Sequence, residues 1–158
     1  MRAAGRLAWY ERLLVADYYL AALLLLVAGL LKVWNKPELS ELLLSLYELE
    51  ILPFQVVLAI DRWQVPVELI IGTIALYGWQ ARKMAWLLAA IYLLFSGAIA
   101  LASQGYLLLP IYCGCFGAGD AATPALVLIL RNVMIAVPLL FFSRHLQHYT
   151  LCQRFRTS

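Results

Sequence analysis

Two cysteines one residue apart, Cys113 and Cys115, are the side chains of this chain best suited to chemistry. They lie in the glycine-rich segment 111–119, between two long apolar segments. A disulfide needs Cα atoms about 4.4 to 6.8 Å apart, and an extended pair at this spacing lies near or beyond that limit. Gly114 allows the turn that would close the ring. Because so small a ring is strained, its disulfide should have the higher reduction potential of an exchanging bond.

Two other interpretations of this pair stay open. The thiols could form a static disulfide in an oxidising compartment. They could also bind a soft metal ion such as Cu(I) or Zn, although a closed site would then need ligands from a partner or a second protomer. His145, His148 and Cys152 near the C-terminal end lack a fourth ligand, so we assign no metal site to them and leave their roles open.

The composition indicates a membrane protein. Hydrophobic residues make up 65% of the chain and charged residues only 13%, with a mean hydropathy of +0.84. A soluble domain is about half apolar and about a quarter charged. The net charge of +3 gives no sign of nucleic-acid binding, because the basic residues cluster beside apolar segments rather than along one helix face.

Several apolar segments approach the length of about 20 residues that crosses a bilayer. We predict an all-α fold, an integral membrane four-helix bundle that forms one transmembrane domain over residues 1–158. The expected spans are about 13–33, 63–80, 84–103 and 125–142. Segment 54–60 is apolar but too short to span, and Asp61 and Arg62 are expected to end it. We place a tight turn at Arg82 and Lys83, and a polar, basic tail over 143–158.

Leucines recur at helical spacing between the first two spans, which predicts an amphipathic surface helix over about 38–52. Its opposite face carries Glu38, Glu41 and Glu48. The helix could lie in the bilayer interface or cap the bundle. Its acidic face argues against binding to anionic lipid.

Four spans place both termini on one side of the membrane, and the distribution of positive charge indicates which side. Eight basic residues fall on the side of the termini, against Lys36 and Arg62 on the other. Because cytoplasmic loops are rich in Lys and Arg, both termini should be cytoplasmic and the Cys113–Cys115 loop extracytoplasmic.

Ionisable side chains inside the spans are costly and are therefore candidates for function. Helix directions place Lys32, Glu68, Arg131 and Asn132 in the same outer half of the bundle. We expect Glu68 to pair with Arg131 or Lys32 beneath the thiol loop, where a nearby cation would favour a thiolate. A purely structural pairing and a snorkelling Lys32 are the alternatives.

The chain resembles the MauE branch of the DoxX-like four-helix membrane proteins, which are linked to methylamine utilisation and redox chemistry. The resemblance rests on four segments in order: 28–32 (AGLLK), 66–69 (PVEL), 113–117 (CGCFG) and 130–132 (LRN). It implies a bacterial inner-membrane protein in which Cys113 and Cys115 are the redox pair. Gly114 and Phe116 complete the most specific motif. Tyr112 stands where many relatives have Asp, which leaves the acid-base partner of the thiols open.

The resemblance also implies a periplasmic thioredoxin-like partner and the maturation of a disulfide-rich enzyme such as methylamine dehydrogenase. Quinone-linked relatives make a quinone the cofactor to consider, although no sequence signature for its ring is present. The leading hypothesis is therefore a membrane component of extracytoplasmic thiol–disulfide exchange. The alternatives are a non-catalytic scaffold that docks a periplasmic partner through its acidic helix, and a metal-handling protein. Partner identity, oligomeric state and direction of electron flow stay open.

Overall fold

The structure is a computed structural model, which describes residues 9–34, 41–103, 110–111 and 123–146. This part of the chain is helical apart from turns and one short antiparallel ladder, which confirms the predicted all-α class. The elements are α1 (Trp9–Trp34), α2 (Glu41–Glu48), α3 (Phe54–Tyr77), α4 (Ala81–Ala102), β1 (Pro110–Ile111), β2 (Thr123–Pro124) and α5 (Ala125–Leu146).

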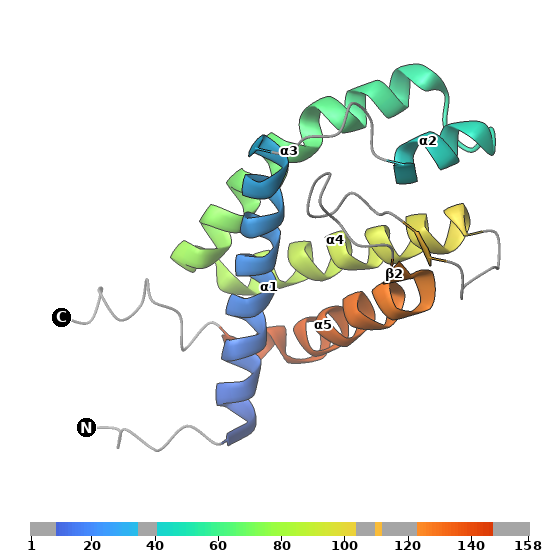
Figure 1. The fold of residues 1–158 in the computed structure, drawn as a ribbon. Coiled ribbons are helices and arrows are strands. Elements are labelled where there is room, and N and C mark those ends of the chain that lie inside the picture. Colours follow the sequence, from blue (N-terminus) through green and yellow to red (C-terminus); the bar gives the residue numbers. More distant parts are fainter. Residues whose placement is uncertain (1–8, 35–40, 104–109, 112–122, 147–158) are drawn as a thin grey trace, which may run out of the picture.

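The long helices pack in two pairs. α1 lies against α3, α4 lies against α5, and α1 also contacts α5 (Figure 1). Alanines at the crossings let the helices approach closely, and larger side chains such as Tyr18, Leu88 and Leu139 fill the centre. Outward-facing positions are apolar as well, as in Leu94 and Phe141, each 74% exposed. An apolar outer surface around a tightly packed centre is the pattern expected of helices in lipid.

Two helices of the described part are long and apolar enough to cross a membrane. They are Arg12–Trp34 and Ala81–Ala102, with mean hydropathies of 2.2 and 2.1. Ala125–Phe141 is apolar but shorter. α3 is long enough but carries Asp61, Arg62 and Glu68. The composition and these two helices together indicate a membrane protein.

The helix that contains the second predicted span begins earlier than the sequence suggested. α3 begins at Phe54 rather than about residue 63, because the helix continues through Asp61 and Arg62. Its buried positions, Val57, Glu68, Gly72 and Ala75, fall on one face, and Asp61 is partly buried on that face while Arg62 is exposed. Pro53 precedes the first residue of the helix, where the missing N–H of proline costs nothing.

The turn between α3 and α4 also differs from the prediction. Arg82 and Lys83 lie inside the first turn of α4, not in the connection. Gly78 and Gln80 make the turn instead, with φ angles of 76° and 47°. The Gly78 N–H donates to the carbonyl of Ala75 and so caps α3.

The predicted amphipathic helix is present but shorter. α2 ends at Glu48 rather than about residue 52, and residues 35–40 lie outside the described part. Leu42, Leu43 and Leu46 are buried, and α2 contacts α3 and α4. The apolar face therefore packs on the other helices, which favours the capping alternative over a helix lying free in the interface.

A two-residue ladder precedes α5. Pro110 pairs with Pro124 and Ile111 with Thr123, and Figure 1 shows β2 leading into the start of α5. α5 continues to Leu146, so the first residues of the predicted tail are helical, and residues 147–158 lie outside the described part.

Candidate functional site

The two most buried charged side chains of the described part form an ion pair between α1 and α3. Lys32 Nζ donates to Glu68 Oε1 at 2.7 Å, and the two side chains are only 6% and 5% exposed. Gln64, one turn before Glu68 on α3, donates from Nε2 to the same oxygen at 3.1 Å. One carboxylate oxygen thus accepts two hydrogen bonds inside an apolar setting, where the charges would be costly without each other.

The helix surfaces around this pair are shaped to hold it. Gly29 faces Glu68 across the α1–α3 contact, and a Cβ at Gly29 would lie 3.2 Å from the Cβ of Glu68. The ring of Phe95 on α4 also lies near the pair, with its centroid 6.0 Å from Lys32 Nζ. Glycine thus lets the helices approach, and an aromatic face contacts the ammonium group.

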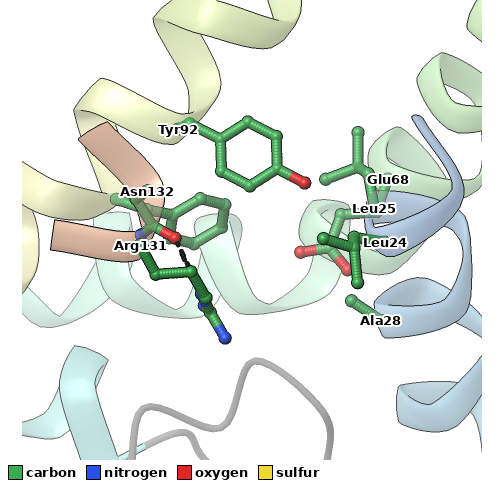
Figure 2. A pocket seen from close by; sticks show the side chains of 8 residues that line it. Leu24, Leu25, Ala28, Glu68, Tyr92, Arg131 and Asn132 are labelled. Carbon is green, nitrogen blue, oxygen red and sulfur yellow. Dashed lines mark hydrogen bonds between the residues drawn. The ribbon is translucent and has the colours of Figure 1, made fainter. Parts of the chain in front are cut away.

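A small cavity adjoins the ion pair at the meeting point of α1, α3, α4 and α5. Its volume is about 30 Å³. Figure 2 shows Glu68, Tyr92, Arg131 and Asn132 around it, with apolar walls from α1. Arg131 Nε and Nη2 donate to Asn132 Oδ1 at 3.3 and 3.2 Å. Glu68 Oε2 is buried and has no hydrogen-bond partner within the described residues.

Tyr92 fixes the position of α4 against α1 beside the cavity. Its hydroxyl donates to the backbone carbonyl of Ala21 at 2.9 Å. On the same side of α1, Tyr18 donates to the carbonyl of Ala75 on α3 at 2.8 Å. Two tyrosines therefore tie three helices together through main-chain oxygens.

A larger groove of about 430 Å³ lies between α2, α3 and α4. It is lined by apolar side chains, with Trp63 and Phe95 as its aromatic members and Gln64 as its polar one. Phe95 also lines the small cavity, and Gln64 hydrogen-bonds to Glu68. The groove and the ion pair are thus linked through two side chains.

The structure brings together the four polar residues that were expected to share one depth. Lys32 and Glu68 form one of the two anticipated pairings, and Arg131 and Asn132 line the cavity that Glu68 also lines. Cys113, Gly114, Cys115 and Phe116 fall in residues 112–122, outside the described part. The ladder pairs Ile111 with Thr123, the residues that flank this segment.

Sequence reasoning missed three members of the site. Gln64 could have been predicted from the sequence, because it lies four residues before Glu68 and therefore on the same helix face. Tyr92 and Phe95 had none, since only tertiary packing brings α4 to the ion pair. Within the residues described, no group of three or more His, Cys, Asp or Glu side chains could hold a metal ion.

Comparison with known proteins supplies the family. The family model described as methylamine utilisation protein MauE matches residues 11–144. No curated protein and no solved structure gives a significant match. The matched region includes the ion pair, the residues around the cavity and the Cys-Gly-Cys segment. The chain therefore belongs to the MauE family of membrane-associated methylamine utilisation proteins.

Proposed function

We propose that the protein is a membrane component of extracytoplasmic thiol–disulfide exchange, with Cys113 and Cys115 as the reacting pair. The observation that carries this proposal is the ladder between β1 and β2. It joins the two flanks of an eleven-residue segment, 112–122, that contains both thiols and follows an apolar membrane helix. Two thiols confined between fixed flanks can be presented to a partner protein.

The proposed reaction needs only the two cysteines and the disulfide of the partner. The thiolate of one cysteine attacks a partner disulfide, which forms a mixed disulfide and releases one partner thiolate. The second cysteine then attacks the mixed disulfide and releases the other partner thiolate. The protein loses two electrons and two protons to become a disulfide, and the partner gains them to become a dithiol. The same steps in reverse oxidise the partner.

We place α1, α3, α4 and α5 in the bacterial inner membrane as a four-helix bundle and a single domain. The burial of Lys32 and Glu68 against each other supports this placement, because ionisable groups inside a membrane face the bundle interior and pair there. The distribution of basic residues supports cytoplasmic termini and an extracytoplasmic thiol segment.

Lys32, Glu68, Arg131 and Asn132 are proposed to support the thiol segment, residues 112–122, rather than to react. Lys32 lies in the last turn of α1, and Arg131 and Asn132 lie about two turns into α5, which follows the ladder directly. The Lys32–Glu68 pair holds the end of α1 against α3, and Arg131 and Asn132 line the adjoining cavity near the start of α5. A partner of thioredoxin type and a disulfide-rich substrate such as methylamine dehydrogenase fit the family assignment.

The resemblance makes a quinone, a membrane-soluble electron carrier, a candidate cofactor. The groove between α2, α3 and α4 could hold one. Its volume of about 430 Å³ is within the range of about 300–1,000 Å³ typical of ligand pockets. Trp63 and Phe95 could stack on a quinone ring, and Gln64 could donate to a ring carbonyl. A bound quinone would supply two-electron redox chemistry in the membrane.

Trapping the mixed disulfide tests the proposal. Single Cys113→Ser and Cys115→Ser variants, made in the full chain in cells, should each be examined for a covalent adduct on non-reducing gels, with Cys152→Ser as the control. We expect a reducible adduct with a periplasmic thioredoxin-fold protein in one variant, and none with both cysteines replaced. Full activity and no adduct in both single variants would exclude exchange by these thiols.

A scaffold that docks a partner through α2 is the second candidate. The observation in its favour is that the buried leucines of α2 face the bundle while Glu48 is exposed. This hypothesis predicts that Glu48→Lys abolishes function and that the cysteine variants retain it. The opposite pattern would exclude it.

A further inference from the structure

The small cavity is lined by a carboxylate with one oxygen that has no hydrogen-bond donor among the described residues. Glu68 is 4% exposed, and its Oε1 accepts from Lys32 and Gln64. Its Oε2 is buried and has no partner within the described residues. A buried carboxylate oxygen left without a hydrogen bond costs free energy, so its neighbourhood is where a ligand would be stabilised most.

The size and charge of the cavity restrict what could bind there. A volume of about 30 Å³ is enough for a water molecule, which needs roughly 10–15 Å³ by the same measure. Lys32 on α1 and Arg131 on α5 place two positive charges nearby, which disfavours a cation. The carboxylate itself disfavours an anion. The hydroxyl of Tyr92 on α4 already donates to Ala21. A small neutral molecule that donates a hydrogen bond meets these conditions.

We propose that the cavity is a buried water site, in which water donates a hydrogen bond to Glu68 Oε2. Polar groups of Arg131 and Asn132 line the same space and supply the further contacts that a buried water needs. The site is independent of the proposed thiol exchange.

Filling the cavity tests the proposal. Ala28 lines it and is 7% exposed, so Ala28→Val would occupy the space with methyl groups. We expect Ala28→Val to lower the melting temperature of the protein, because it displaces water from Glu68. The same change in a Lys32→Met/Glu68→Leu background should leave the melting temperature unchanged or raise it, since no carboxylate remains to be hydrated.

The two backgrounds separate loss of water from a simple steric clash. A clash would lower the melting temperature equally in both backgrounds, and a dry cavity would give an increase in the wild-type background. Either result would overturn the proposal.

A second measurement needs no variant. Magnetisation transfer from water protons in solid-state NMR of the full chain in bilayers should reach the Glu68 carboxyl carbon. The control is Leu88, which is fully buried and does not line the cavity. Transfer to Glu68 as slow as transfer to Leu88 would contradict a bound water.

Discussion

Lys32 Nζ and Glu68 Oε1 lie 2.7 Å apart although their residues are 36 positions apart in the chain. The contact joins the last turn of α1 to the middle of α3 at a point where both side chains are buried. A buried ion pair of this kind contributes little net stability compared with apolar residues, but removing one partner leaves the other charge buried alone. Its energetic effect therefore depends on which residues are changed together.

Lys32→Met should lower the free energy of unfolding by about 3–5 kcal/mol, because Glu68 loses its cation. Replacing both residues, as Lys32→Met/Glu68→Leu, should recover most of this loss. Denaturant unfolding in detergent micelles measures both, with the exposed Lys83→Met as the control. If the double variant is as unstable as the single variant, the pair stabilises the fold by more than the mutual neutralisation of its two charges.

Gly72→Ala should destabilise the α1–α3 contact. A Cβ at Gly72 would lie 3.0–3.1 Å from the Cβ, Cα and N of Leu26, and a backbone cannot yield as a side chain does. We expect a loss of about 1–3 kcal/mol in the free energy of unfolding.

Gly97→Ala is the matched control for that change, because no packing neighbour among the described residues, outside the local backbone of α4, lies within 4 Å of its added Cβ. It should be neutral or raise stability by roughly 0.5–1 kcal/mol through helix propensity. Equal effects at the two glycines would contradict the close approach at Gly72.

Tyr18→Phe should cost about 0.5–1.5 kcal/mol in unfolding free energy, the usual value of one hydrogen bond. The loss should fall at the low end of that range, because the Ala75 carbonyl keeps its bond from the Gly78 N–H at 2.9 Å. Tyr77→Phe, at a 67% exposed residue, should have no effect on the same unfolding curve.

A short-chain quinone analogue should quench the fluorescence of Trp63 if it binds in the groove. Trp63→Phe is then expected to remove most of the saturable quenching in micelles. Trp79→Phe should retain it, since Trp79 does not line the groove. Quenching that is unaffected by Trp63→Phe would place the quinone elsewhere or exclude it.

The positions of α1, α4 and α5, in which charged residues are few, could be predicted from the sequence. Apolar length alone located α1, α4 and α5 to within a few residues, because lipid-facing and buried positions are both apolar there. Helix direction and depth limited the expected partner of Glu68 to Lys32 or Arg131, and the structure pairs it with Lys32. Each residue advances a helix by about 1.5 Å, so the depth of a side chain in the bundle can be calculated from its position in the sequence.

Other features depend on tertiary contacts that no local pattern conveys. The start of α3 was missed because Asp61 and Arg62 interrupt the apolar pattern without interrupting the helix. The ladder of β1 and β2 is two residues long, too short for any alternation to indicate it. The roles of Tyr92 and Phe95 depend on the packing of α4 beside the ion pair, which the sequence alone does not show.

The ladder has a consequence for how the thiol segment can vary. Pairing Ile111 with Thr123 sets the separation of the two flanks at one interstrand spacing, whatever lies between them. The number and identity of residues 112–122 are thereby uncoupled from the distance that α4 and α5 must keep. We therefore expect substitutions within residues 112–122 to leave the packing of α4 against α5 unchanged.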